Sequence, residues 1–179
     1  MKSKARGILT EDMKRVVREQ RLGFVATVCS DGSPNLSPKG TTTIWDDDHL
    51  VFADISSPRT VENLRINPVA EINVVDPVVR KGYRFKGRAE VITDGPRFTE
   101  IVRFYSAGDA GVDTGLADAE KRIRSVVVLR VERAIPLISP AYDLGLSEED
   151  VRRTWEVYWE KLRRERSSEV AAPGDGEVR

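Results

Sequence analysis

The chain has 179 residues, 40% of them hydrophobic and 32% charged, a composition typical of a folded domain with its own core and not of a disordered chain. Its 29 basic and 29 acidic residues give a formal net charge of zero, so the basic excess typical of nucleic-acid-binding proteins is missing from the sequence. The single cysteine, Cys29, excludes an internal disulfide framework and favours a reducing compartment.

The sequence shows no sign of a membrane segment or of secretion. No apolar stretch approaches the roughly 20 residues that span a bilayer. The basic start, MKSKARGILT, lacks the apolar core of a signal peptide. We therefore expect a cytoplasmic protein with no membrane partner and no nucleic-acid partner.

The first elements are an amphipathic helix and a buried strand. Thr10 is a typical helix cap, followed by two acidic residues at the positive end of the helix dipole. Residues 22–29 are apolar and β-branched almost without interruption, which is typical of a barrel strand covered on both faces. Because Cys29 ends this apolar run, we assign it to packing and not to thiol chemistry.

Residues 34–63 hold the most informative pattern in the chain. A turn signal at residues 30–33 leads into a strand over residues 35–44. The strand is unusually polar, with hydroxyl, amide and amino side chains at Asn35, Ser37, Lys39, Thr41, Thr42 and Thr43. Such polarity is ordinary at the edge of a sheet and informative at its centre. We interpret this strand as a ligand-facing strand.

The acidic turn that follows is not predicted to bind a metal. Asp46, Asp47 and Asp48 are adjacent in a turn, so their side chains diverge, and no cluster of histidine or cysteine supports them. His49 is the only histidine, which leaves little material for a catalytic triad or a Cys-His pair. We expect His49 to be solvated or to cap the turn.

A helix start follows the next strand, residues 50–54. Ser56 or Ser57 can cap a helix that begins at Pro58 and ends before Pro68. Arg59 and Thr60 then lie in its first turn, where free NH groups, the helix dipole and a guanidinium come together. This combination suits a phosphate group. The alternative is an ordinary surface arginine on an ordinary helix.

The middle of the chain continues the alternation of strands and helices. The pattern predicts three further strands, over residues 69–75, 80–93 and 125–134. It predicts helices over residues 96–106 and 116–124, and loops over residues 108–115 and 139–145. The strand over 80–93 has a basic face, but nothing else in the sequence extends it into a nucleic-acid surface. Within this strand, Gly82 would let a ligand approach the backbone closely.

The last predicted element is an amphipathic helix over residues 147–166, capped by Ser147. Its apolar stripe, which serves either the core or a partner, consists of Val151, Trp155, Tyr158, Trp159 and Leu162. Residues 167–179 are expected to be a disordered tail. We therefore predict a single domain over residues 1–166: a mainly β, α+β fold in which six antiparallel strands form a small barrel with added helices.

Five segments occur in the order LGFVATV, SDGSPNLSPKG, DDDHLVFAD, SPRTVENLRINP and KGYRFKGRAEV. In this order and spacing the chain resembles the split barrels that bind flavin mononucleotide (FMN) and are related to pyridoxamine 5'-phosphate oxidase. The resemblance covers about residues 10–140. It implies a six-stranded antiparallel split β-barrel and a homodimer with two flavins at the subunit interface.

The resemblance also implies a set of flavin-binding residues. On the polar strand these are Ser37, Pro38, Lys39, Gly40, Thr41 and Thr42. At the helix start, Arg59 and Thr60 correspond to the phosphate-binding pair, with Asn63 one turn further on. Lys81, Gly82 and Tyr83 correspond to the segment along the edge of the isoalloxazine ring. The helix that carries Trp155 and Trp159 is a candidate for a contribution from the partner subunit.

The chain departs from the oxidase itself at two places. The oxidase has an Arg-x-x-x-x-Lys pattern on the flavin strand, where this chain has only Lys39. The oxidase also carries a C-terminal Arg-x-His that holds the vitamin phosphate, whereas His49 lies far from the C-terminus here. Pyridoxamine 5'-phosphate is therefore not the expected substrate.

The resemblance predicts an FMN-dependent oxidoreductase that acts on a small molecule. The flavin would supply the redox chemistry, and Lys39 or the NH of Gly40 would supply a donor near N1 and O2 of the ring. No side chain is assigned as a catalytic acid or base. The alternatives are a non-catalytic flavin carrier or electron-transfer module, the same barrel with F420 or haem, and a dimeric ligand-binding protein without redox chemistry.

Overall fold

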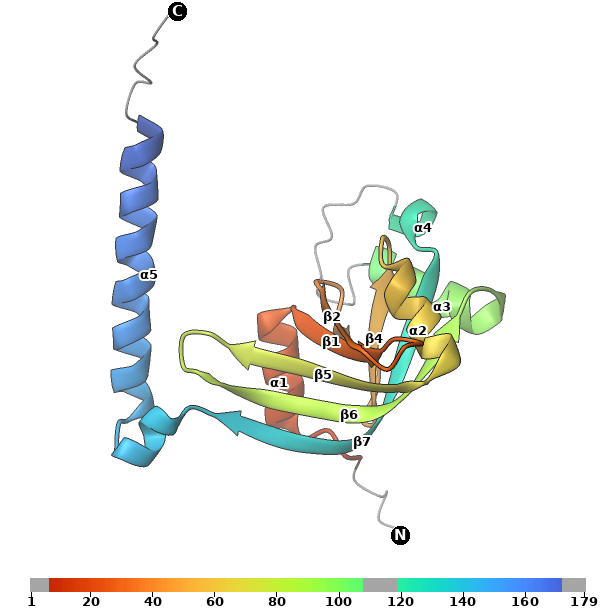
Figure 1. Ribbon diagram of the computed structural model, residues 1–179, viewed down its shortest axis with the longest axis horizontal. Coiled ribbons are helices and arrows are strands. Elements are labelled where there is room, and N and C mark those ends of the chain that lie inside the picture. Colours follow the sequence, from red (N-terminus) through yellow and green to blue (C-terminus); the bar gives the residue numbers. More distant parts are fainter. Residues whose placement is uncertain (1–6, 108–118, 172–179) are drawn as a thin grey trace, which may run out of the picture. The chain divides into compact units, whose positions relative to one another are not determined.

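A computed structural model describes residues 7–107 and 119–171 of the chain (Figure 1). The chain divides into two compact units. The first, Met1–Val75 together with Gly82–Leu137, contains most of the sheet, and the second consists of Asp76–Lys81 and Ile138–Arg179. The loop predicted over residues 108–115 lies outside the described residues.

The elements largely follow the predicted order. The strands are β1 (Gly23–Val28), β2 (Pro34–Lys39), β3 (Thr43–Ile44), β4 (His49–Asp54), β5 (Val69–Asp76), β6 (Lys81–Ile92) and β7 (Ser125–Ile138). The helices are α1 (Glu11–Gln20), α2 (Pro58–Ile66), α3 (Gly95–Ser106), α4 (Ala119–Arg122), the short 3-10 helix η1 (Pro140–Leu144) and α5 (Glu148–Ala171). Helix α5 therefore continues five residues beyond the end predicted for it at residue 166.

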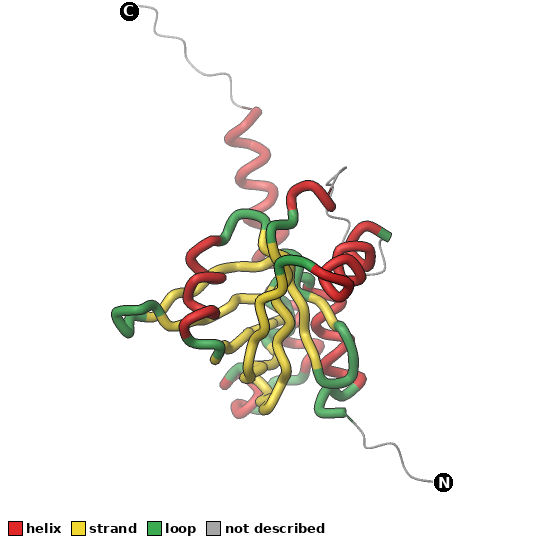
Figure 2. The backbone as a smooth tube through the Cα atoms, turned by 90° about the vertical axis from the view of Figure 1, so that its right-hand side faces the viewer, coloured by secondary structure: helices red, strands yellow, loops and turns green. Residues whose placement is uncertain are grey.

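All seven strands belong to one sheet, in the order β2-β1-β5-β6-β7-β4-β3. The strand pairs β1–β2, β1–β5, β3–β4 and β4–β7 are antiparallel. Strands β2 and β3 form the two edges, yet only residues 40–42 connect them along the chain. Because so short a link spans little distance, the sheet must curl until its edges approach each other (Figures 1 and 2).

This curled sheet confirms the predicted mainly β split barrel, with one correction. The barrel has seven strands and not six, because the strand expected over residues 35–44 is interrupted. The NH of Thr42 donates to the carbonyl of Lys39 at 3.2 Å, which makes a tight turn between β2 and β3. The turn lets a single run of polar sequence serve both edges of the sheet.

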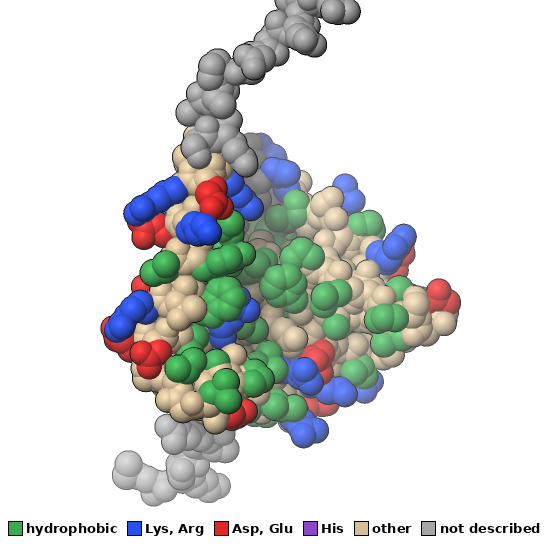
Figure 3. All heavy atoms as spheres, turned by 60° about the vertical axis from the view of Figure 1, so that its left-hand side comes forward, with side chains coloured by type: hydrophobic (Ala, Val, Ile, Leu, Met, Phe, Trp, Pro, Cys, Tyr) green, Lys and Arg blue, Asp and Glu red, His purple; other side chains and the backbone are tan. Residues whose placement is uncertain are grey.

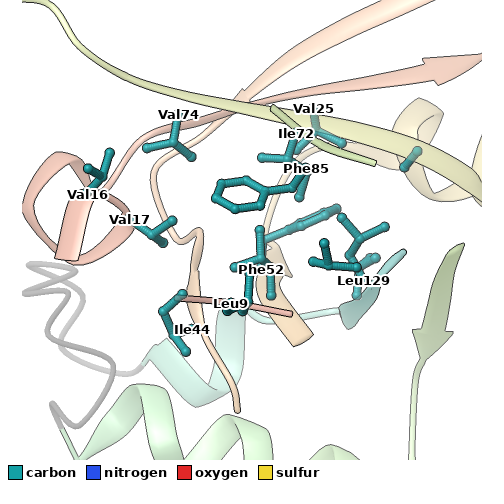
Figure 4. Close-up of a cluster of buried hydrophobic side chains, with 14 of the residues drawn as sticks. Leu9, Val16, Val17, Val25, Ile44, Phe52, Ile72, Val74, Phe85 and Leu129 are labelled. Carbon is teal, nitrogen blue, oxygen red and sulfur yellow. The ribbon is translucent and has the colours of Figure 1, made fainter. Parts of the chain in front are cut away.

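The interior of the barrel is a continuous apolar core (Figure 4). Phe52 of β4 and Phe85 of β6 are its largest fully buried side chains. Helix α1 closes the core from one side with Val16 and Val17, which are both buried. The helix begins where Thr10 accepts a hydrogen bond from the NH of Met13 at 3.3 Å, as its sequence predicts.

A second apolar cluster covers the outer face of β4 and β7. Val51 lies opposite Val128, and both are buried on the side of the sheet that faces α3. From α3, Ile101 and Tyr105 pack onto them. Strands β4 and β7 are thus covered on both faces, which accounts for the almost unbroken apolar runs in their sequences.

The acidic turn holds its carboxylates apart. Asp46 contacts Nδ1 of His49 at 2.7 Å, Asp47 pairs with Nζ of Lys14 at 2.7 Å, and Asp48 accepts the NH of Ile8 at 2.8 Å. Each carboxylate therefore serves a different neighbour, and the turn fastens α1 and the residues before it to the barrel.

The second unit is built on the turn between β5 and β6. The guanidinium of Arg80 lies 3.4 Å from the ring centre of Trp155, and Nζ of Lys81 lies 2.9 Å from the carboxylate of Glu148. The hydroxyl of Tyr142 donates to the carbonyl of Val79 at 2.6 Å. These contacts attach η1 and the start of α5 to the turn.

Only part of the predicted stripe of α5 is covered. Val151 is buried and Trp155 is half-buried, whereas Tyr158 and Trp159 remain 45% and 42% exposed. Figure 3 shows hydrophobic side chains lying among charged ones on this helix. Within the described residues, no helix combines the length and the apolar character needed to cross a membrane.

Candidate cofactor site

Strand β2 turns its polar side chains inward and its apolar side chains outward, the reverse of the usual pattern. Its polar residues Ser37 and Lys39 alternate with Leu36, which is 65% exposed, and with the exposed Pro38. Ser37 lies opposite the fully buried Val25 of β1, so the polar side chains share the inward face of the strand. The apolar side chains face outward. Strand β2 is an edge of the sheet and not a central strand, so its polarity alone would be ordinary. The inward direction of its polar side chains is what argues for a polar task inside the barrel.

Lys39 is the centre of the polar cluster. The residue is only 4% exposed, and its Nζ lies 2.5 Å from Oγ of Ser37, 2.8 Å from Oγ of Ser57 and 3.5 Å from Oγ1 of Thr60. Strand β2 and the start of α2 are thus joined through one buried ammonium group. An ammonium group with several hydroxyl partners is a satisfied buried cation.

The cluster contains one buried cation and one buried carboxylate. Burial lowers the pKa of Lys39, while the negative charge of Asp54 acts against that shift. Asp54 is also buried, and its Oδ1 accepts the NH of Ser57 at 2.7 Å. Within the described residues, Lys39 and Asp54 form no direct ion pair. The hydroxyls are the direct hydrogen-bond partners of the ammonium.

The start of α2 presents further donors. Ser57 occupies the N-cap position, but its side chain makes no capping hydrogen bond and contacts Lys39 instead. Pro58 follows at the first helical position. Arg59 is exposed, and its guanidinium makes no hydrogen bond or ion pair with any part of the chain that the structure describes. In this first turn, Pro58 has no NH and the NH groups of Thr60 and Val61 donate to the carbonyl of Ser57 at 3.1 and 3.4 Å. The guanidinium of Arg59 is therefore the group at this helix start that is best placed to bind an anion.

The turn after β2 is held rigidly. Oγ1 of Thr41 donates to the carbonyl of Ala53 at 3.2 Å and accepts its NH at 3.0 Å, so the side chain replaces a strand partner. The hydroxyl of Tyr105 donates to the carbonyl of Thr41 at 2.8 Å, and burial raises the pKa of this phenol, which keeps its proton in place. Gly40 next to this turn is exposed, with open space where a side chain would lie.

The structure gives Thr42 and Asn63 structural roles. Thr42 is buried, and its hydroxyl donates to the carbonyl of Lys39 at 2.9 Å. Nδ2 of Asn63 donates to Oγ1 of Thr27 at 3.0 Å and reaches Sγ of Cys29 at 3.5 Å. Asn63 is 4% exposed, so it anchors α2 to β1 from behind the site.

The third predicted group is divided between the two units. Lys81 belongs to the second unit and pairs with Glu148, whereas Gly82 and Tyr83 belong to the first. Gly82 permits a close approach, but to β5: a Cβ here would lie 2.1 Å from the carbonyl oxygen of Val74. The hydroxyl of Tyr83 donates to a carboxylate oxygen of Asp12 on α1.

Three contributors to the site were not predicted. Ser57 was expected only as a cap, and no role was predicted for Asp54 or Ser125. Asp54 lies opposite Ser125 in the β4–β7 pair, and the hydroxyl of Ser125 is buried without a hydrogen-bond partner in the described structure. A hydroxyl directly before a helix, a serine at the start of a strand and an acid at a strand end are too common in sequences to single these residues out.

The donor set fits a phosphate group. One buried ammonium and three hydroxyls gather at the start of α2, with Arg59 in the first turn of the helix, and Asp54 is the one carboxylate described in the cluster. Positive charge, hydroxyl donors and helix NH groups are the usual means by which proteins bind phosphate. The geometry thus defines a split barrel with a buried cluster of one ammonium and three hydroxyls at the start of α2.

The comparison with protein families agrees with this geometry. A sequence profile of the family described as pyridoxamine 5'-phosphate oxidase matches residues 9–136, well over half of the chain. The protein therefore belongs to this family of split barrels, which confirms the resemblance seen in the sequence. None of the curated proteins matches the chain.

Solved structures share the fold. HupZ from Group A Streptococcus is 31% identical, with a TM-score of 0.62 over 74% of this chain and 96% of that one. An FMN-binding protein from Syntrophomonas wolfei is 14% identical, with a TM-score of 0.56 over 72% of this chain and 85% of that one. An F420 reductase is 22% identical, with a TM-score of 0.53 over 70% of this chain and 98% of that one.

Proposed function

We propose that the protein binds FMN and uses it in an oxidoreductase reaction on a small molecule. The observation that carries the proposal is the cluster at the start of α2, where three hydroxyls surround the ammonium of Lys39 and Arg59 follows in the first turn of the same helix. This donor set suits the terminal phosphate of FMN. Family membership supports the same cofactor, since a protein of this fold is known as FMN-binding.

The two halves of the cofactor make different demands on the chain. The phosphate would be held by Arg59 and the hydroxyls. Gly40, exposed and without a side chain, leaves room for the ring system beside β2. Bound FMN supplies hydride or electron transfer, and the residues of this chain supply orientation and positive charge.

We further propose that the active form is a homodimer. Strands β1 and β2 carry an apolar outer face, in which Phe24 lies opposite Pro38 and Val28 lies opposite Pro34. Phe24 and Val28 are 41% and 40% exposed, beside the still more exposed Leu36. An outward apolar face of a sheet is typical of a surface that a partner covers. A second copy fits because the chain carries no net charge that would oppose self-association.

The test of the cofactor is the visible absorption spectrum of the purified protein, followed by mass spectrometry of the molecule released by heat. We expect a flavin spectrum and the mass of FMN. A colourless protein that also fails to take up added FMN would contradict the proposal. A haem or F420 spectrum would mean that the same barrel binds that cofactor in place of FMN.

The test of the reaction is steady turnover. NADH, NADPH or dithionite serves as the reductant, and a quinone or oxygen serves as the acceptor. Continuous oxidation of NADH or NADPH by the FMN-loaded protein would support an enzyme. Bound FMN that is reduced once by dithionite, without turnover by any donor, would instead indicate a carrier or electron-transfer module.

A further inference from the structure

The hydrogen bonds of Lys39 have a fixed direction. An ammonium group has three protons and no lone pair, so it can only donate. The hydroxyl oxygens of Ser37, Ser57 and Thr60 therefore act as acceptors towards Nζ, at 2.5, 2.8 and 3.5 Å. Each hydroxyl keeps its own proton, which must point away from Nζ. Lys39 thereby turns these hydroxyls into donors towards whatever lies beyond them.

The hydroxyls differ in their access to a ligand. Ser37 and Ser57 are half-buried, whereas Thr60 is 2% exposed and Lys39 itself 4% exposed. Nζ of Lys39 also lies 6.0 Å from the ring centre of Phe52, a side chain of the apolar core. The ammonium thus lies between the core and the hydroxyls. The serine hydroxyls are the more accessible part of the cluster.

Ser57 is held in place from two directions. Its NH donates to Asp54 at 2.7 Å, and its Oγ accepts from Lys39. The side chain is therefore not used to cap the first turn of α2. This arrangement leaves the hydroxyl proton of Ser57 for an external acceptor. A phosphate has enough acceptor oxygens to use several such hydroxyl protons together.

We propose that Lys39 is a positioning residue that orients the hydroxyls of Ser37, Ser57 and Thr60 towards the cofactor phosphate, and so makes the site select FMN over riboflavin. The inference rests on the proposed binding of FMN and assigns Lys39 an indirect role in it. Lys39 does not contact the flavin ring. Its ammonium sets the direction of the hydroxyl donors, and these donors contact the phosphate.

The experiment compares two ligands with the same ring system. Apoprotein of the full chain is titrated with FMN and with riboflavin, and the quenching of flavin fluorescence gives both affinities. Wild-type protein is expected to prefer FMN. Lys39→Met should weaken FMN binding by about 10- to 100-fold and riboflavin binding by less than about threefold, since only FMN carries the phosphate.

A second variant separates positioning from direct contact. Ser57→Ala keeps the positive charge of Lys39 and removes one of the oriented hydroxyls. We expect this variant to lose part of the preference for FMN, by about tenfold. Combined with Lys39→Met, Ser57→Ala should cost little more, because Lys39 acts through this hydroxyl. If the two losses instead multiplied in the combined variant, Lys39 would act independently of Ser57 and the positioning role would be wrong.

A third variant tests simple charge balance. In Lys39→Met, the buried Asp54 loses its neighbouring positive charge and could repel a phosphate on its own. The double variant Lys39→Met/Asp54→Asn removes that repulsion. We expect the double variant to show the same low ratio of FMN to riboflavin affinity as Lys39→Met. Recovery of the wild-type preference would overturn the proposal in favour of plain neutralisation of Asp54.

The pH profile provides a readout that a merely structural role would not change. Because burial lowers the pKa of Lys39, the amine becomes neutral earlier than an ordinary lysine as the pH rises. A neutral amine has a lone pair that accepts a hydroxyl proton, which reverses one hydrogen bond. The ratio of FMN to riboflavin affinity should therefore fall with rising alkaline pH in wild type and in Ser57→Ala, and stay flat in Lys39→Met.

The remaining outcomes are also decisive. Equal preference for FMN in wild type and in a folded Lys39→Met protein would overturn the role of Lys39 and leave the proposed function intact. Wild-type protein that binds neither FMN nor riboflavin would overturn both. Thermal unfolding of each variant, followed by circular dichroism, shows that the proteins compared are folded.

Discussion

At the scale of single residues, the site depends on the partners that each polar side chain finds. Lys39 and Arg59 are both basic and lie near the same helix start. Lys39 is buried among hydroxyls, whereas Arg59 is exposed and has no hydrogen-bond or ion-pair partner among the residues that the structure describes. A buried cation mainly organises its neighbours, whereas a free guanidinium can contact a ligand directly.

Arg59→Ala should therefore weaken FMN binding directly. Loss of a charge-assisted contact costs about 1.5–3 kcal/mol of binding free energy. The measurement is the FMN dissociation constant from fluorescence titration. Arg65→Ala is the matched control, because Arg65 is an exposed arginine in the last turn of the same helix. Equal FMN affinity in the two variants would remove Arg59 from the site.

Tyr83 supplies a prediction of pH-dependent stability. Its hydrogen bond to Asp12, together with burial, raises the pKa of Tyr83 to about 12 in the folded state, whereas an exposed tyrosine titrates near its ordinary value of 10.0. A raised pKa means that the folded state holds the proton more tightly. The resulting stability is complete below pH 10 and is lost as the pH rises from 10 to about 12.

Tyr83→Phe should accordingly reduce the free energy of unfolding by about 1 kcal/mol at pH 8, and the difference from wild type should shrink at alkaline pH. Urea unfolding at pH 8 and at pH 11 measures both values. A difference that is the same at the two pH values would contradict the assigned hydrogen bond. The absorbance of tyrosinate at 295 nm reports the titration itself.

At the scale of elements, strand β2 combines two faces with opposite character. On its inward face, Lys39 donates a hydrogen bond to Ser57 at the start of α2. Its outward residues form an apolar face together with those of β1. The turn over residues 40–42 then redirects the chain into β3 at the other edge of the sheet. One short run of sequence therefore positions the candidate site and helps to curl the barrel.

Two glycines in predicted cofactor-binding positions should respond very differently to alanine. At Gly82 the added Cβ would lie 2.1 Å from the carbonyl oxygen of Val74 and 2.7 Å from the Cα of Val75, and backbone cannot move away cheaply. Gly82→Ala should cost about 3 kcal/mol or more of folding stability. At Gly40 no atom lies within 4 Å of an added Cβ.

Gly40→Ala is therefore the matched control, and its stability should stay within about 0.5 kcal/mol of wild type. Chemical denaturation followed by circular dichroism measures both variants. Similar stability of the two alanine variants would show that β5 and β6 do not pack as closely as the structure indicates.

At the scale of the whole molecule, the proposed homodimer depends on the outer face of β1 and β2. Phe24→Glu and Leu36→Glu each place a charge in the middle of this apolar face. We expect wild-type protein to be a dimer at micromolar concentration and the two variants to be largely monomeric, because an unpaired charge is costly to bury. Light scattering coupled to size-exclusion chromatography measures the mass.

Ser30→Glu serves as the control, because it adds the same charge at an exposed turn position outside the β1–β2 pair. This variant should keep the wild-type mass. A wild-type monomer would contradict the homodimer, and dimeric Phe24→Glu and Leu36→Glu variants would move the interface to another surface of the chain.

Much of the fold was predictable because its signals are local. The cap at Thr10, the apolar run of β1 and the helix start at Pro58 each depend on neighbouring residues, and the structure shows a helix, a strand and a helix at these places. The number of strands was not predictable in the same way. The break after Lys39 depends on hydrogen bonds from Thr41 and Thr42 to partners that sequence spacing alone does not reveal.

The sequence by itself determined the family, the split barrel and the candidate residues, because hydrophobic periodicity and motif order are properties of the chain alone. Only the tertiary structure decided which partners those residues have within the chain. Asn63 and Gly82 are occupied with internal packing, while Lys39, Ser37, Ser57 and Thr60 meet at one end of the barrel. The physical reason is that burial and hydrogen-bond partners arise between segments far apart in sequence, when the sheet curls and brings β2 against the start of α2.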